Sequence, residues 1–268
     1  MKQRKPAVAG TFYPGRKDEL LIMLKEMMEP GQEKKPALGV MAPHAGYIYS
    51  GRGAGIVFSR VNVPDDVVVL GVNHRGLGAD VAIISQGTWL TPLGEVKINT
   101  ELARMIKAGS ELVSEDETAH RSEHSLEVQI PFLQLARPGF SLVPLCLSRM
   151  SIEQCEELGK ALAAALKKWG KPVLLVASSD MSHYIAAEEA KKKDNLALEK
   201  ILKLDPRGLY QTVFENDISM CGVIPVAVML VAAKEMGAQS AELVDYRNSG
   251  DVTGDYREVV AYAAVMVR

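Results

Sequence analysis

The chain has 268 residues, of which 47% are hydrophobic and 24% are charged; this composition supplies a sizeable core and excludes a disordered protein. The formal net charge is -2 and the longest basic run is the three lysines at 191–193, so we expect neither nucleic acid nor a membrane surface as a partner. No apolar stretch approaches the roughly 18 residues that span a bilayer. Because the N-terminus also lacks a signal-peptide pattern, we expect a cytoplasmic protein.

The first half of the chain predicts alternating helices and strands. In chain order, the pattern indicates a helix at 19–28, a strand at 37–41, a helix at 50–60, a strand at 66–72, short strands at 81–84 and 87–91, and a helix at 101–107. We expect Asp18 and Thr100 to cap the first and last of these helices. The two short strands are candidates for a hairpin with each other.

The second half of the chain continues the alternation. It predicts a helix at 126–135, a strand at 141–147, a helix at 151–169, a strand at 172–177, helices at 186–204, from 206 and at 222–236, and strands at 241–245 and 258–267. Pro131 lies inside the first of these helices, which is therefore kinked there or starts late. Ser151 is the expected cap of the next one. Without any linker-like composition, the alternation predicts a single α/β domain over residues 1–268, with a mainly parallel or mixed central sheet flanked by helices.

Three of the predicted strands end just before a histidine. His44 follows the strand at 37–41, His74 follows the strand at 66–72, and His183 follows the strand at 172–177. A single buried histidine is more often a hydrogen-bonded core residue, but the carboxyl ends of strands in an open α/β sheet converge on one crevice. We therefore expect a shared site, where imidazole could bind Fe, Cu or Zn or act as a general base. Asp180, in the same loop as His183, either orients a histidine, acts as a base or satisfies local backbone N–H groups.

The three cysteines are Cys146, Cys155 and Cys221, and their spacing argues against a disulfide scaffold and a zinc finger. Cys155 and Cys146 fall on core positions of a helix and a strand. Cys221 precedes the buried helix at 222–236, where unpaired backbone N–H groups would lower the pKa of a thiol. It is the candidate nucleophile or soft metal ligand, and the alternative is a small buried residue.

The polar segment at 110–126 contains His120 and His124 at a spacing of four residues. Its polarity favours an exposed, solvated pair over a metal site. Glu123 and His124 could still line the rim of the crevice. The glycine-rich stretch at 51–55 is a weak dinucleotide signal, and close packing of a helix on the sheet is the favoured interpretation over a phosphate site.

Motifs along nearly the whole chain resemble those of the Memo family, the B component of the AmmeMemoRadiSam set. The motifs occur in this order: Val8-Ala9-Gly10-Thr11-Phe12-Tyr13-Pro14, Ala42-Pro43-His44-Ala45-Gly46-Tyr47, Asn73-His74, Glu123-His124-Ser125-Leu126-Glu127, Ser178-Ser179-Asp180 with His183, and Cys221-Gly222. The resemblance implies a fold like that of the class III extradiol (LigB-type) non-haem iron dioxygenases.

The resemblance also implies roles for individual residues. It places His44, His74 and Cys221 at metal-binding positions, and Asp180 and His183 in the same pocket as catalytic residues. Extradiol dioxygenases hold iron with two histidines and a glutamate, whereas here a thiolate takes the place of the carboxylate. Because sulfur is softer and easily oxidised, this set favours Fe(II) or Cu and redox chemistry over ring cleavage.

The leading expectation is therefore a non-haem, metal-dependent oxidoreductase that acts on an unknown substrate. One alternative is a non-catalytic signalling module that binds a peptide or a phosphate group in the same pocket. Another is a metal-independent enzyme with Cys221 as nucleophile and His183 as base. The resemblance further implies a radical-SAM protein of the same set as a partner.

Overall fold

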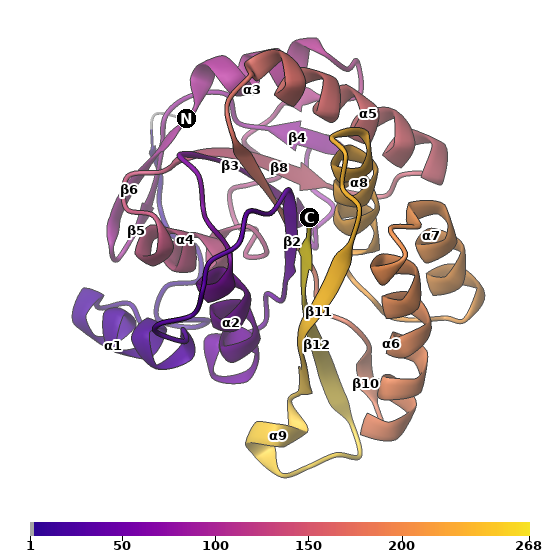
Figure 1. The fold of residues 1–268 in the computed structure, drawn as a ribbon. Helices are drawn as coiled ribbons and strands as arrows, with labels where there is room; N and C mark the ends of the chain where they lie inside the picture. The colour runs from indigo at the N-terminus through magenta and orange to yellow at the C-terminus, as the bar shows by residue number, and fades with distance from the viewer. Residues whose placement is uncertain (1–2) are drawn as a thin grey trace.

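A mixed β-sheet runs through the part of the chain that the computed structural model describes, residues 3–268 (Figure 1). Its strands are β1 (Gln3–Arg4), β2 (Gly39–Ala42), β3 (Asp66–Val72), β4 (Val81–Ile83), β5 (Thr88–Thr91), β6 (Gly94–Ile98), β7 (Ser114–Glu115), β8 (Ser141–Leu147), β9 (Val173–Ser178), β10 (His183–Ile185), β11 (Ala241–Asn248) and β12 (Val259–Val267). The hydrogen-bonded order is β1-β5-β6-β8-β3-β9-β2-β12-β10, with β11 paired to β12 and β4 paired to β7 and β8. The first two residues, on which the signal-peptide expectation partly depends, lie outside the described residues.

Helices cover both faces of this sheet (Figure 1). They are α1 (Lys17–Met27), α2 (Arg52–Arg60), α3 (Thr100–Ala108), α4 (Ile130–Ala136), α5 (Ile152–Trp169), α6 (Ala187–Leu202), α7 (Pro206–Glu215), α8 (Val223–Glu235) and α9 (Gly250–Thr253), with a π-helical turn at Tyr47–Gly51 and a 3-10 turn at Glu127–Gln129. On one face α8 packs against β2, β3 and β9, and α5 and α7 pack against α8. On the other face α2 packs against β2 and β12, and α1 and α4 pack against α2. The predicted α/β class, with a mixed central sheet flanked by helices, is confirmed.

The four central strands of the sheet are parallel and apolar, so polar residues can gather only where these strands end. Strands β8, β3, β9 and β2 are adjacent and parallel, and their residues are almost entirely buried apolar side chains, as expected for parallel strands covered on both faces. Parallel strands bring their carboxyl ends to one edge, so the loops after β2, β3, β8 and β9 emerge side by side. Helix α8, buried along its length as its sequence predicts, begins at the same edge.

Several boundaries differ from the sequence prediction. Strand β5 pairs with β6, which the sequence analysis missed, and not with β4; the turn between them uses Gly94 at φ +124°. Asn99, not Thr100, caps α3, because the Asn99 side chain accepts the N–H of Leu102 at 3.0 Å. Helix α1 starts at Lys17 and has no side-chain cap, so the prediction for Asp18 was wrong.

Other local predictions are confirmed. Pro131 lies in the first turn of α4, so this helix starts late, after the 3-10 turn. Ser151 caps α5 through a reciprocal pair of bonds with Gln154. Close packing also accounts for the glycine-rich stretch, since a Cβ at Gly55 would lie 2.4 Å from the carbonyl oxygen of Met27. No helix within residues 3–268 combines the length and the apolar character needed to cross a membrane.

Candidate metal centre

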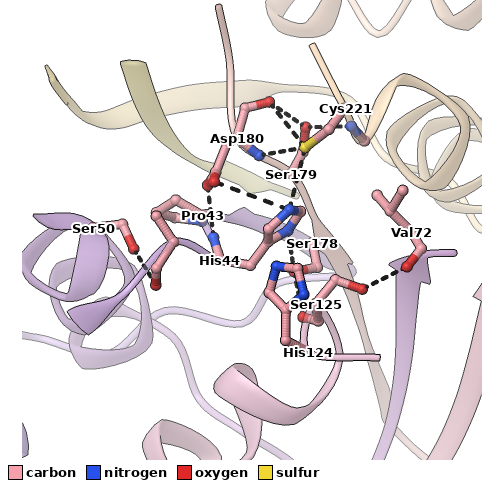
Figure 2. Close-up of polar contacts among 12 residues, drawn as sticks. Pro43, His44, Ser50, Val72, His124, Ser125, Ser178, Ser179, Asp180 and Cys221 are labelled. Carbon is pink, nitrogen blue, oxygen red and sulfur yellow. Dashed lines mark hydrogen bonds and ion pairs between the residues drawn. The ribbon is translucent and has the colours of Figure 1, made fainter. Parts of the chain in front are cut away.

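The carboxyl edge of the sheet brings together most of the candidate residues (Figure 2). His44 follows β2, His74 follows β3 and Asp180 follows β9, which lies between β2 and β3 in the sheet. Cys221 comes from a different direction, immediately before α8. The ligand atoms of His44, His74 and Cys221 all lie within 4.8 Å of one another.

A hydrogen-bond chain sets the tautomer of His44, whose side chain is 2% exposed. The hydroxyl of Ser178 donates its single proton to the carbonyl oxygen of Ser125 at 2.7 Å and accepts a bond from Gln129 Nε2 at 2.8 Å. It lies 2.9 Å from His44 Nδ1, so Nδ1 must be the donor of that bond. Nε2 of His44 therefore carries the lone pair of the ring, and the sulfur of Cys221 lies 3.2 Å from it.

Charge and burial keep His44 neutral. Burial lowers the pKa of His44 well below its usual value, and the nearby His74 and His124 lower it further. The rings of His44 and His74 meet edge to face at 5.1 Å, and the rings of His74 and His124 stack at 4.5 Å. A neutral imidazole with a free Nε2 is the form of histidine that binds metals.

Glu123 orients the side chain of His74. Its carboxylate is 1% exposed and accepts the backbone N–H and the Nδ1–H of His74, at 2.8 and 2.9 Å. It also accepts the backbone N–H groups of His124 and Ser125, both at 2.9 Å. Burial alone would raise the pKa of Glu123, but the bond from His74 and these N–H groups lower it to about 2. Because Glu123 accepts the Nδ1–H of His74, Nε2 is the ring nitrogen that His74 can offer to a metal, as in carboxylate–histidine–metal pairs.

The prediction of an exposed pair at His120 and His124 was wrong. His120 is completely buried and donates from Nε2 to the carbonyl oxygen of Ala82 at 3.1 Å. His124 is 22% exposed and lies against His44 and His74, and burial lowers its pKa to about 4. The segment forms turns and not a helix. The spacing of four residues therefore does not place His120 and His124 on one helix face. Glu123 accordingly lies under the histidines, whereas His124 lines a cavity.

Cys221 completes the group. Its sulfur is 3.2 Å from His44 Nε2 and accepts the backbone N–H of Asp180 at 3.3 Å (Figure 2). Burial raises the pKa of the Cys221 thiol, and the Asp180 carboxylate raises it further. The expected lowering of this pKa by the helix N-terminus was therefore wrong, because burial outweighs the helix end. Cys146 and Cys155 are fully buried in the core, as expected.

The donor set fits a metal ion. One nitrogen from each of two imidazoles and one sulfur lie within 4.8 Å of one another, close to the spacing that bonds of about 2.0–2.3 Å around one ion require. The backbone N–H of Asp180 on the sulfur is the kind of contact that supports a thiolate ligand. Imidazole with thiolate suits Fe, Cu and Zn better than Mg or Ca.

Asp180 and His183 lie beside this group. Asp180 is 4% exposed, accepts the backbone N–H of His44 at 2.7 Å, and has its other oxygen 4.0 Å from His44 Nε2. Burial raises the pKa of Asp180. His183 donates from Nδ1 to the carbonyl oxygen of Ser219 at 2.8 Å, so its Nε2 is free to accept a proton. Both residues line a cavity of about 380 Å³ together with His124.

Two supporting residues were missed by the sequence analysis. Ser178 and Gln129 set the tautomer of His44, and both are completely buried. A signal existed for Ser178, since a polar side chain ends the apolar run of β9. Gln129 carried no comparable signal, because its role depends on the turn that precedes α4.

Gly222→Ala tests how closely the chain must pack at Cys221. A Cβ at Gly222 would lie 2.3 Å from the Ser179 Cβ and 2.5 Å from the Ser178 carbonyl oxygen. We expect the variant to lose about 1–3 kcal/mol of unfolding free energy, measured by urea denaturation. Gly46→Ala, whose Cβ would have no neighbour nearer than 3.8 Å, is the matched control and should change stability by less than about 0.5 kcal/mol. Equal effects of the two substitutions would contradict this account of the packing.

Comparison with known proteins gives a consistent result. A family model described as "Memo-like protein" matches residues 4–266. A MEMO1 family protein of Aquifex aeolicus is 45% identical, over 99% of each chain, and one of Methanosarcina barkeri is 45% identical, over 98% of this chain and 99% of the relative. Among solved structures, the uncharacterized protein JW3007 from Escherichia coli K12 shares the fold, with a TM-score of 0.57, 16% identity, and coverage of 84% of this chain and 98% of that one.

Proposed function

This chain belongs to the Memo family, and from that premise we propose that it is a redox protein in which His44, His74 and Cys221 hold one Fe or Cu ion. The observation that carries the proposal is the convergence of their three ligand atoms within 4.8 Å. The tautomer of His44, which leaves its Nε2 unprotonated, supports it. We further propose that the protein is a non-haem oxidoreductase with a fold like that of the LigB-type dioxygenases.

The protein's own residues would hold and tune such an ion. Ser178 and Glu123 fix the orientation of His44 and His74 through their Nδ1 atoms, and the N–H of Asp180 supports the sulfur of Cys221. When bound, the ion would supply electron exchange with a substrate or with oxygen. Loss of such supporting contacts typically weakens metal binding by about 10–100-fold.

Asp180 and His183 are the proposed proton-transfer residues. Because burial raises the pKa of Asp180, its carboxyl can hold a proton at the oxygen that faces His44 Nε2, 4.0 Å away. His183 can accept a proton at Nε2, since its Nδ1 is committed to the Ser219 carbonyl oxygen. Both groups face the cavity of about 380 Å³, through which a proton or a small reactant would approach.

The two alternative functions have less support. A cysteine nucleophile needs a thiolate near neutral pH, whereas burial raises the pKa of Cys221. A phosphate or phosphopeptide site beside Asp180 would need cationic partners, and the described residues that line this cavity include no lysine or arginine; Arg75 and Arg149 line a separate cavity. The proposal also keeps a cytoplasmic location and a radical-SAM partner, which depend on composition and on family resemblance.

Elemental analysis of anaerobically purified protein tests the proposal. We expect close to one Fe or Cu per chain, and oxygen consumption when the loaded protein is exposed to air. A chain that binds neither metal after incubation with Fe(II) or Cu would contradict the metal centre. A metal content near one without oxygen consumption would retain the metal centre and remove the oxygen-dependent chemistry.

A further inference from the structure

A second and larger cavity also reaches the candidate metal centre. This cleft has a volume of about 780 Å³, and His74 and Cys221 both line it. Sites for small organic ligands usually have volumes of roughly 300–1,000 Å³. The cleft is therefore large enough for a substrate that reaches the proposed metal centre at His74 and Cys221, separately from the cavity lined by Asp180 and His183.

One wall of the cleft is apolar. It is formed by α7, by the loop that follows and by the first turn of α8 (Figure 1), and it includes Val213, Phe214, Ile218, Met220 and Ile224. The side chain of Phe214 is 56% exposed. A large aromatic residue left exposed at the mouth of a cleft favours a ligand with an apolar body, which would remove this surface from water.

Another part of the cleft lining is polar and positively charged. Strands β3 and β8 are paired so that Val72 lies beside Leu147, and the residues after them, Arg75 and Arg149, emerge together and line the cleft. Arg149 is exposed, and its side chain forms no hydrogen bond or ion pair with another described residue. Arg75 donates only one bond, from Nε to the Ser122 carbonyl oxygen at 3.0 Å.

Two further polar groups lie in the same cleft. Asp80 is the one carboxylate among the residues that line it, so the two arginines leave a net charge of +1. Asn73 is 8% exposed and donates from Nδ2 to the Leu77 carbonyl oxygen at 2.8 Å, while its Oδ1 has no partner. This oxygen is buried from solvent, so it makes no contact with the contents of the cleft and leaves the arginines as the charged hydrogen-bond donors of the cleft.

We propose that this cleft binds a small organic acid with an apolar body, and that this acid is the substrate of the centre formed by His44, His74 and Cys221. The apolar body lies on the wall at Phe214 and Ile218, and the carboxylate pairs with Arg149. The role as substrate depends on the proposed function, whereas the binding of the acid does not.

Octanoate is a simple probe with the required chemistry, and calorimetric titration of the full chain measures its binding. We expect one saturable site with a Kd on the order of 1 mM or tighter. Octan-1-ol, which lacks the charge, should bind at least about fivefold more weakly, and octylamine should not saturate the site, because an ammonium is repelled by the arginines.

Variants identify the site. Arg149→Gln and Phe214→Ser should each weaken octanoate binding by about fivefold or more, since they remove the charge partner and the apolar wall. Arg16→Gln is the matched control, because Arg16 is an exposed arginine next to α1 and should leave the Kd unchanged. Absence of saturable binding overturns the inference, as does a Kd that neither Arg149→Gln nor Phe214→Ser changes.

The same preparations separate this inference from the proposed function. Protein that contains about one Fe or Cu per chain but does not bind octanoate would overturn the cleft proposal alone. Protein that binds octanoate with the expected variant pattern but takes up no metal would overturn the metal centre alone, and the acid would then be a ligand of the cleft and not a substrate of a metal site.

Discussion

Replacing His44 and Cys221 together by alanine is expected to reduce the metal content of the protein from near one ion per chain to background. Two of the three ligand atoms that lie within 4.8 Å of one another would be removed. Of these three ligands only His74 then remains, and its side chain is 31% exposed. His74 also lies within 4.8 Å of ligand atoms of Glu123 and His124, but the Glu123 carboxylate already accepts four N–H bonds, so we do not expect that group to retain a metal ion through purification. Elemental analysis of anaerobically purified variant and wild-type protein measures the difference.

Two controls make this result specific. Cys155→Ala removes a thiol that is fully buried in the core away from the site, so it should retain the wild-type metal content. Circular dichroism and urea denaturation should show that the double variant remains folded, because no core apolar side chain is removed. Near-stoichiometric metal in a folded double variant would contradict the assignment of His44 and Cys221 as ligands.

Much of the fold and part of the site follow from local patterns in the chain. The bounds of β3 and β8 agree with the sequence prediction because uninterrupted apolar runs have only one buried arrangement in a parallel sheet. The approach of His44 to His74 was also predictable, since parallel strands bring their carboxyl ends to one edge. The pairing of β5 with β6 was missed, because the alternating residues of β6 after the tight turn at Pro92-Leu93-Gly94 were not recognised as a strand.

The supporting residues could not be predicted in the same way. Glu123 was a candidate for the rim of the crevice, whereas in the structure it is buried and accepts four bonds from three residues. The local sequence shows that Glu123 is polar. It does not show that His74, at the end of the distant strand β3, will supply two of the hydrogen bonds to its carboxylate. The raised pKa of Cys221 also depends on contacts between distant parts of the chain. The loop after β9 buries the thiol, and this burial raises the pKa more than the N-terminus of α8 lowers it.

Arg4→Met is expected to produce the largest loss of stability. Arg4 is 2% exposed and its Nη1 lies 2.6 Å from a carboxylate oxygen of Glu127, which is also buried. Its Nε and Nη2 donate to the carbonyl oxygens of His120 and Glu123, at 2.8 and 2.7 Å. Methionine would retain most of the volume but leave the Glu127 charge without a cation. Breaking a buried pair in this way costs about 3–5 kcal/mol of unfolding free energy.

Denaturation in urea measures this loss, and an exposed ion pair supplies the control. Arg207 is 45% exposed and pairs with Glu153 and Glu156, so Arg207→Met should cost no more than about 1 kcal/mol. Arg4 also bonds to the backbone carbonyl groups of His120 and Glu123 and so fixes the loop that supports His74. If the Arg4→Met variant remains folded, we therefore expect it to bind metal more weakly than wild type. The Arg207→Met variant should bind metal as wild type does. Similar small losses in both variants would show that the Arg4–Glu127 pair does not anchor the N-terminal strand beneath the site.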